Sequence, residues 1–380
     1  MSIKSVATAT RSMITGVMDL PTFKDHTLAV LAVLADPIQA ELIQATIPVR
    51  APDGTTSNHV FFNIPPLPPG ADRKTSRPAT RPLDIRLFIF DAQVFKSEFD
   101  AFTSVLDVVR SQKSPLLTED LRPIATALTK DQEEFIDRDG IESVLYTMAQ
   151  AMGTALDAAN GQGARKNAGT LFEKLIQATL DMCGIRSGKG TLRIPVSVDG
   201  TTIAAFGQAP RIDRAALENE DGEPNAPDVE IEHDNLTYGP EVDIILSSIP
   251  DGPIPHNRTT VDSRELLVSI KTTSKDRMAK MFVDHYVLTK TLGEEIKTVG
   301  IFLHDIQRSN EGVASTFVSG MFLVYRAFFG DLAGIYYLDP PVRSASGVWK
   351  DHIFPFRRFL LRDMWTLIVS PVAPPIGTPE

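Results

Sequence analysis

Hydrophobic positions change their spacing along the chain, and the change separates a helical part from a sheet. Residues 1–62 alternate short apolar runs with turns, and residues 83–90 are typical of a strand. Across residues 95–159 apolar side chains recur every three or four positions, which predicts helices with one buried face. A further helix is predicted at residues 168–182, with Gly184 as its C-cap.

After Gly184 the apolar spacing falls to two, which is the period of a half-buried strand. An Asp199-Gly200 turn predicts a hairpin between residues 191–198 and 201–206. The remaining predicted elements are strands at residues 242–249, 266–272 and 299–303, and helices at 276–292 and 356–368. Strands mixed with helices in this order predict an α/β fold class with a mixed central sheet flanked by helices.

These patterns predict three regions. Residues 1–160 form an N-terminal accessory region of unknown role, with strands within residues 1–90 and helices within 95–160. Residues 161–370 carry the sheet and the candidate chemistry. Residues 371–380 are rich in Pro and Gly and are expected to be a flexible tail.

Composition excludes several classes of protein. With 43% apolar and 23% charged residues in 380, the chain is typical of a globular protein. Its one cysteine, Cys183, excludes an internal disulfide and a cysteine-based zinc cluster, and it fits a reducing cytoplasm. The longest apolar run, residues 28–35, is too short to cross a membrane. A net charge of −10 argues against general polyanion binding, although a local basic cleft is compatible with it.

Common catalytic motifs are also missing. The segment from Gly184 to Gly190 is one residue too short for a phosphate-binding Walker loop and lacks the Ser or Thr that holds magnesium. No GxSxG, HExxH or CxxC pattern occurs, and the seven histidines form no pair at metal-ligand spacing on a helix.

One acidic and one basic residue mark two successive predicted strands. Asp243 opens the first strand, and Lys271 lies near the end of the second. Carboxylates hold Mg²⁺, which polarises a phosphate and lowers the pKa of a bound water, and a lysine can position that water and offset negative charge. This pair therefore favours phosphodiester hydrolysis. The alternative is that Asp243 caps a strand and that Lys271 is a solvated strand end.

The helix that follows carries a polar face. Arg277, Lys280 and Asp284 recur at helical spacing, so Asp284 can bring a second carboxylate to the metal and Arg277 can reach a base. The alternative is a solvated face in which Lys280 and Asp284 form an i,i+4 pair, worth a few tenths of a kcal/mol.

These motifs resemble those of the PD-(D/E)xK type II restriction endonucleases, in particular the EcoRII/NgoMIV group, which cuts CCGG or CC(N)GG-type sites. The resemblance rests on Pro240-x-x-Asp243, Ser269-x-Lys271, Lys275-Asp276-Arg277 and Asp284. In this group Ser often replaces the acid before x-Lys, and the role passes to an acid on the next helix. The chain departs from the group by Lys275 in place of Arg and by Asp284 in place of Glu.

The resemblance implies a restriction-endonuclease-like core with an N-terminal extension and assigns roles to residues. The implied catalytic residues are Asp243, Lys271, Asp284 and Glu173; the metal ligands are Asp243 and Asp284; the DNA-binding residues are Lys275, Asp276, Arg277 and Lys280. Glu265 is a reserve candidate for the second carboxylate. The implied cofactor is Mg²⁺. The implied partners are double-stranded DNA, a second copy of the chain in a homodimer or tetramer, and a cognate DNA methyltransferase.

Three functions are consistent with the sequence. The leading one is a type II restriction endonuclease that makes Mg²⁺-dependent double-strand cuts at a palindrome. A second is a repair or mobile-element nuclease with structure-specific or non-specific cleavage, which would not give discrete plasmid fragments. A third is a non-enzymatic DNA-binding or scaffold protein in which Asp243 and Lys271 are incidental.

Overall fold

A computed structural model of the chain contains a six-stranded sheet in the order β13-β12-β9-β8-β7-β4. The described residues are 3–35, 43–50, 56–63, 80–125, 127–159, 163–189, 191–195, 237–248, 254, 258–293, 296–309, 312–315, 319–341, 344 and 347–369. The strands of this sheet are β4 (Arg186–Gly188), β7 (Ile244–Ser247), β8 (Glu265–Thr273), β9 (Lys297–His304), β12 (Gly334–Tyr337) and β13 (Ile353–Pro355).

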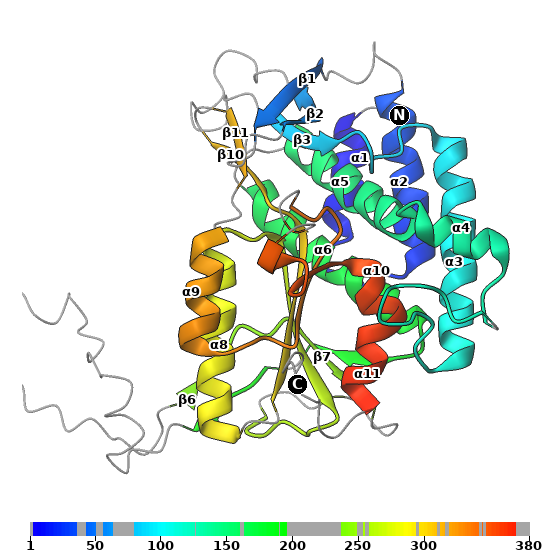
Figure 1. Ribbon diagram of the computed structural model, residues 1–380. Coiled ribbons are helices and arrows are strands. Elements are labelled where there is room, and N and C mark those ends of the chain that lie inside the picture. The colour runs from blue at the N-terminus through cyan, green and yellow to red at the C-terminus, as the bar shows by residue number, and fades with distance from the viewer. Residues whose placement is uncertain are drawn as a thin grey trace, which may run out of the picture.

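Strand direction defines a functional edge of this sheet. Strands β8, β9, β12 and β13 are parallel, whereas β7 is antiparallel to both β8 and β4. Parallel neighbours need crossover connections, which α8 (Lys275–Leu292) and α9 (Ser319–Phe329) supply. The C-terminal ends of the parallel strands therefore meet at one edge of the sheet, which is called the functional edge below (Figure 1). The predicted α/β class with a mixed central sheet flanked by helices is confirmed.

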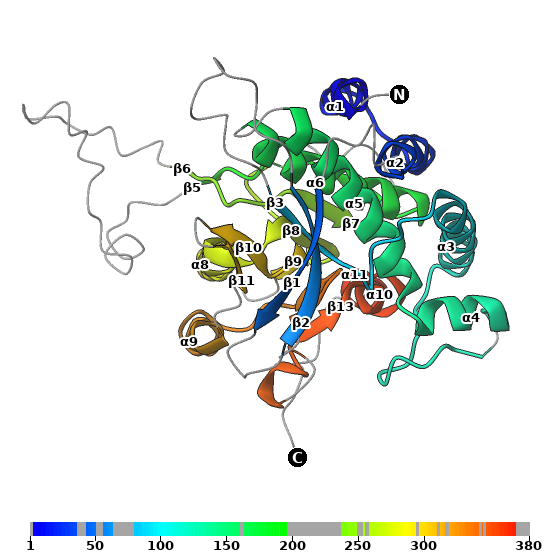
Figure 2. The ribbon, with the colours of Figure 1, turned by 90° about the horizontal axis from the view of Figure 1, so that it is seen from above.

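Side chains alternate between the two faces of the sheet. On β8, Val268 and Ile270 belong to a large apolar core on the side of α6 (Gly163–Met182), whereas Leu267 joins a smaller cluster with Leu288 of α8. Figure 2 shows α8 and α9 on one side of the sheet, and α6, α10 (Phe356–Arg358) and α11 (Met364–Val369) on the other. A π-helical turn at Phe359–Asp363 joins α10 to α11.

The helical prediction for residues 95–159 is confirmed by three helices. They are α3 (Ala92–Gln112), α4 (Lys130–Asp137) and α5 (Gly140–Ala159). The next predicted helix is part of α6, and Gly184 follows it in the left-handed region at φ 74°. Strands at 242–249, 266–272 and 299–303 are confirmed as β7, β8 and β9 with shifted ends, and the predicted helices at 276–292 and 356–368 are also present.

Two helices near the start of the chain were not predicted. They are α1 (Ile3–Ser12) and α2 (Leu20–Leu34), and both pack beside α5. A recognisable signal starts α2, because the Asp19 carboxylate accepts a hydrogen bond from Thr22 N and Pro21 lies in the first turn. The apolar runs of this segment alternate with turn-forming residues, and this alternation hides the helical period.

The strand predicted at residues 83–90 is wrong over most of its length. Strand β3 is Thr80–Asp84, and the chain then turns. The Asp84 carboxylate accepts a hydrogen bond from Arg86 N, and the Asp84 carbonyl accepts from Phe88 N. A side chain that closes a local turn in this way competes with a continued strand.

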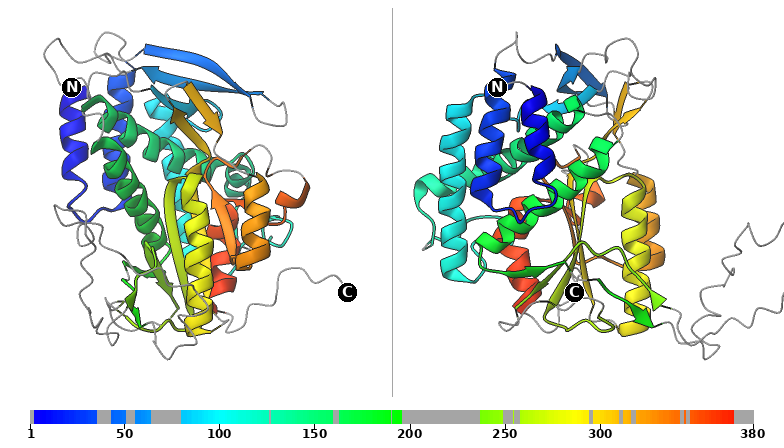
Figure 3. Two further views of the ribbon diagram at one scale, coloured as in Figure 1. Left: turned by 90° about the vertical axis from the view of Figure 1, so that its left-hand side faces the viewer. Right: turned by 180° about the vertical axis from the view of Figure 1, so that it is seen from behind.

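A small antiparallel sheet lies beyond the functional edge. It consists of β1 (Ile43–Arg50), β2 (Thr56–Asn63) and β3, and it lies next to the hairpin of β10 (Ile306–Ser309) and β11 (Gly312–Ser315) (Figure 3). Arg81 fixes this sheet to α5, because its buried guanidinium donates to Gln150 and Asp157 at 2.7 and 2.9 Å. Gly153 leaves room for that guanidinium, since a Cβ there would overlap it.

The large apolar core crosses the predicted regional boundary at residue 160. It contains side chains of α2, α3 and α5 together with those of α6, β8 and β9. The boundary itself stays a prediction. The predicted hairpin at 191–206 lies mostly outside the described residues, as does the tail at 371–380; within the described part, β5 (Ile194–Pro195) pairs with β6 (Thr237–Tyr238). None of the described helices is long and apolar enough to span a membrane.

Candidate active site

The pairing of β7 with β8 brings Asp243 and Lys271 together. Ile244 faces Val268 in the antiparallel register, and Asp243 N donates to the Val268 carbonyl at 3.0 Å. The Asp243 carboxylate accepts a hydrogen bond from Ile270 N at 2.7 Å. Lys271 Nζ lies 2.9 and 3.2 Å from its two oxygens. The predicted pair is therefore a direct ion pair at the functional edge.

Glu241 is a second carboxylate on the same lysine. Its Oε1 lies 3.0 Å from Lys271 Nζ. Val242 N donates to the Pro240 carbonyl at 3.0 Å, so Glu241 is the central residue of a three-residue turn that precedes β7. The sequence prediction did not assign Glu241 a role. The sequence offers only its closeness to Asp243 as a signal, because the turn at Glu241 interrupts the period of two by which strand residues are placed.

The two carboxylates keep Lys271 in its charged form. Its side chain is only 13% exposed. Burial by itself would lower the pKa of Lys271, but Asp243 and Glu241 raise it above the ordinary value. Lys271 is therefore a protonated ammonium group in the folded protein.

Helix α8 adds two cations on the outer side of Glu241. Arg277 Nη1 lies 3.5 Å and Lys280 Nζ lies 3.8 Å from Glu241 Oε2. Burial would raise the pKa of Glu241, but Lys271, Arg277 and Lys280 lower it below the ordinary value, so Glu241 is ionised. The predicted polar face of α8 thus lies over the site. The side chains of Lys275 and Asp276, at the start of α8, lie outside the described residues.

Asp284 lies behind this site and is 4% exposed. Its carboxylate accepts hydrogen bonds from the Tyr238 hydroxyl and, at 3.0 Å, from Glu241 N. Lys280 Nζ lies 2.9 and 3.1 Å from the two Asp284 oxygens. The i,i+4 pair considered from the sequence is therefore present. The metal-binding role assigned to Asp284 stays a prediction.

Glu173 approaches from α6, on the opposite side of the sheet edge. Burial and the nearby Asp243 carboxylate raise the pKa of Glu173 to about 7, against the opposing effects of Lys271 and Lys189. Glu173 therefore lies within electrostatic reach of the Asp243–Lys271 pair, as the resemblance implied.

Glu265 does not belong to the site. It is the first residue of β8, at the end of the strand opposite to Lys271. Its carboxylate forms a two-pronged ion pair with Arg258, at 2.6 and 2.8 Å, and accepts from Asp262 N at 2.8 Å. Glu265 therefore anchors the segment that precedes β8, and it is no longer a candidate for the second carboxylate.

The donor atoms at the site suit a hard cation. Asp243 and Glu241 offer carboxylate oxygens, which Mg²⁺ prefers. Among the described residues, no three His, Cys, Asp or Glu side chains form a complete metal-binding cluster. Mg²⁺ is usually held by one or two carboxylates, water and the phosphates of its substrate, so two carboxylates fit this ion.

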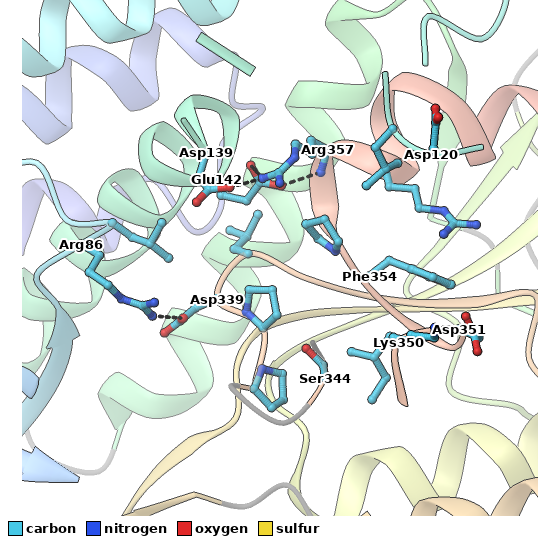
Figure 4. Close-up of a pocket in the computed structure, with 18 of the residues that line it drawn as sticks. Arg86, Asp120, Asp139, Glu142, Asp339, Ser344, Lys350, Asp351, Phe354 and Arg357 are labelled. Atoms are coloured by element: carbon cyan, nitrogen blue, oxygen red, sulfur yellow. Dashed lines mark hydrogen bonds and ion pairs between the residues drawn. The ribbon is translucent and has the colours of Figure 1, made fainter. Parts of the chain in front are cut away.

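A cavity of about 690 Å³ lies elsewhere, near the C-terminal ends of β12 and β13. Figure 4 shows Arg86 directed at Asp339, 3.6 Å away, and Arg357 directed at Glu142. None of the residues predicted for the site lines this cavity. Because Lys271 is on β8, two strands from β12, the cavity is separate from the candidate site.

Comparison with solved structures identifies the fold. The chain is similar to the type IIP restriction endonuclease Kpn2I, with 17% sequence identity, a TM-score of 0.59, and coverage of 98% of this chain and 99% of that chain. A complex of restriction endonuclease PspGI with substrate DNA is 14% identical over 71% of this chain and 91% of that chain, but its TM-score of 0.30 supports no argument. The sequence matches no family model and no curated protein. The chain therefore has the fold of a restriction endonuclease, as its motifs predicted.

Proposed function

We propose that this protein is a type II restriction endonuclease that makes Mg²⁺-dependent, sequence-specific double-strand cuts in DNA. The observation that carries the proposal is the contact of Lys271 Nζ with two carboxylates, at 2.9 Å to Asp243 and 3.0 Å to Glu241. This arrangement lies at the C-terminal edge of parallel strands in a restriction-endonuclease fold. In open α/β sheets, ligands bind at that edge.

The residues divide the chemistry between them. Asp243 and Glu241 would hold Mg²⁺, which when bound polarises the phosphate and acidifies a water. A hydrogen bond from Ile270 N fixes the orientation of the Asp243 carboxylate, so its oxygens would be directed at the metal in advance. Lys271 would orient the water and offset negative charge on the phosphate, a role that its contacts with Asp243 and Glu241 support. Glu173 would exchange a proton near neutral pH, and its pKa of about 7 beside Asp243 supports this role.

Sequence reading is proposed for the start of α8. Arg277 has an exposed side chain whose guanidinium is suited to the O6 and N7 atoms of guanine. Asp276 would accept from cytosine N4 or orient its neighbours, and Lys275 would contact a base or a phosphate. Lys280 would add a phosphate contact. The proposed target is a palindrome that contains CCGG or CC(N)GG.

A palindrome is matched by two copies of the chain related by a two-fold axis. Each chain has one candidate active site around Lys271, so a single chain would cut one strand. Cutting both strands in one event therefore requires a homodimer, and a tetramer would contain two such dimers. A host that carries this activity would need a cognate DNA methyltransferase to protect its own sites. Residues 1–160 are proposed to form an N-terminal accessory region of this nuclease.

The proposal is tested by digesting plasmid DNA with the purified protein and MgCl₂, followed by sequencing of the ends. Discrete fragments with one common end sequence are expected, and EDTA should abolish them. Lys271→Ala protein prepared in parallel is the control for a contaminating nuclease. A smear with random ends would favour the repair or mobile-element nuclease. If a plasmid that carries CCGG and CC(N)GG sites stays intact under all metal conditions, cleavage at these sites is contradicted.

A further inference from the structure

The segment that carries Glu241 is held from both sides of its main chain. Asp284 accepts a hydrogen bond from Glu241 N at 3.0 Å, and Ser269 Oγ donates to the Glu241 carbonyl at 2.9 Å. Ser269 is the residue of the Ser-x-Lys motif at which a carboxylate is usual. Here the serine fixes the backbone of a different carboxylate, which reaches the same lysine.

Tyr238 in turn fixes Asp284. Tyr238 is on β6, where it pairs with Ile194 of β5, and its ring packs on the apolar cluster that contains Ile194 and Leu267. Burial and the neighbouring Asp284 raise the pKa of Tyr238, so the hydroxyl keeps its proton and donates to the Asp284 carboxylate. The carboxylate therefore has partners on both oxygens, namely Tyr238, Glu241 N and Lys280.

We propose that Tyr238 and Asp284 are positioning residues that hold Glu241 against Lys271, and that Asp284 is not itself a metal ligand. A carboxylate buried to 96% with donors on both oxygens has little capacity left for a cation, whereas Glu241 is partly exposed beside the lysine. This inference rests on the proposed function. It assigns to Glu241 the role of the carboxylate that the Ser-x-Lys motif lacks at Ser269.

The test is a set of Mn²⁺ titrations followed by the thermal midpoint of unfolding, since a ligand that binds the folded state raises that midpoint by mass action. Tyr238→Phe and Asp284→Asn are each measured in the wild-type chain and in the Glu241→Gln chain. In the wild-type chain, each is expected to raise the half-saturating MnCl₂ concentration by roughly tenfold, the effect of one hydrogen bond to a charged group. In the Glu241→Gln chain, neither should change it further.

Tyr336→Phe is the matched control. The Tyr336 hydroxyl also donates to a carboxylate, that of Asp363 at 2.9 Å, but Tyr336 is on β12, away from the candidate site. This substitution should lower the metal-free midpoint without changing the Mn²⁺ dependence. DNA cleavage gives a second readout: Tyr238→Phe should lower kcat and leave the DNA dissociation constant unchanged. If Asp284→Asn does not fold, Tyr238→Phe carries the test, because it removes one oxygen and keeps the ring.

Three outcomes would overturn the inference in different ways. If Asp284→Asn weakens Mn²⁺ binding equally in the Glu241→Gln chain, Asp284 is a ligand in its own right. If Tyr238→Phe leaves Mn²⁺ binding unchanged in the wild-type chain, Tyr238 has no positioning role. If Asp243→Asn binds Mn²⁺ as tightly as wild type, or wild type shows no saturable response, the proposed function fails at this site and the inference fails with it.

Discussion

Lys271 Nζ and Asp243 Oδ2 lie 2.9 Å apart, although the two residues are 28 positions apart in the chain. The contact depends on two paired strands, because Asp243 N donates to the Val268 carbonyl and Ile270 N donates to the Asp243 carboxylate. The ammonium group and the carboxylate are therefore brought together by one pair of antiparallel strands, and each can be substituted separately.

Lys271→Ala and Asp243→Ala should each abolish DNA cleavage, with a rate loss of at least about 10²–10⁴-fold, while specific DNA binding largely persists. In the proposed function, both side chains act on the metal and the water and neither contacts a base. Initial rates on plasmid and gel-shift affinities measure the two effects. Lys350→Ala, which removes an exposed lysine beside the separate cavity, is the charge control. Wild-type cleavage by Lys271→Ala would refute the site assignment.

Glu241→Gln should lose cleavage to a similar extent as Asp243→Ala, although sequence motifs give Glu241 no role. The amide keeps the size of the side chain but removes the charge that contacts Lys271 at 3.0 Å. Cleavage rates at saturating MgCl₂ and at limiting MgCl₂ are compared, since a lost ligand is partly rescued by excess metal. An active Glu241→Gln together with an inactive Glu173→Gln would transfer the role to Glu173.

Glu265→Gln should lower the free energy of unfolding and leave the cleavage rate of the folded protein unchanged. Removing one partner of its buried pair with Arg258 leaves an uncompensated charge, which costs about 3–5 kcal/mol in such cases. The free energy of unfolding in urea should fall by this order, while the cleavage rate of the folded fraction stays near wild type. Glu241→Gln, at a more exposed position, should cost much less stability. Equal unfolding midpoints for Glu265→Gln and wild type would contradict the structural role.

Arg277→Ala should bring cognate DNA binding down toward the non-specific level. A lost bidentate contact to guanine costs roughly 1–3 kcal/mol of discrimination, whereas a lost phosphate contact weakens all sequences alike and flattens the salt dependence. Competition binding against sites with each C·G pair replaced separates these effects. Lys275→Ala is measured in parallel. If Arg277→Ala weakens cognate and scrambled DNA equally, Arg277 contacts phosphate and does not read bases.

Asp339→Asn should make the protein more stable at neutral pH. Burial raises the pKa of Asp339 well above its usual value, Asp84 and Asp305 add to the rise, and Arg86 opposes it. The folded state thus binds this proton more tightly than the unfolded state. Stability therefore falls as pH rises above the ordinary carboxyl pKa, because the unfolded state then loses a proton that folded Asp339 retains. The advantage of Asp339→Asn should therefore shrink from about pH 8 down to about pH 4, as followed by urea unfolding. A less stable Asp339→Asn at neutral pH would show that the Arg86 contact outweighs burial.

The sequence was most informative where one regular element carries the chemistry. Apolar runs around Ile244 and Leu267 predict two successive strands, and from these the meeting of Asp243 with Lys271 follows. The helical period likewise placed Arg277 and Lys280 over the same edge. Regular elements have fixed side-chain directions, so their residues can be placed from spacing alone.

The rest depends on contacts that no local period encodes. Glu241 reaches Lys271 from a turn, and the hydrogen bond of Tyr238 to Asp284 joins β6 to α8 across 46 positions. The sequence predicts Asp284 at the metal because it lies on the correct helix face, and that role stays a prediction. The hydrogen bonds of its carboxylate to Tyr238 and Glu241 come from the chain packed against that face. The unpredicted α1 and α2 show a related limit, because short amphipathic helices acquire their stability from tertiary packing.

The hydrogen-bond register of β7 and β8 also determines how relatives of this protein can diverge. Residues between Ser247 and Glu265 connect the two strands, and their number does not enter the pairing of Ile244 with Val268. Insertions or deletions in that connection would change the spacing of Asp243 and Lys271 in the sequence and leave their side chains in contact. A search pattern with a fixed interval between the two residues would therefore miss homologues that keep the same contact between them. A pattern that aligns the two strands first would recover them.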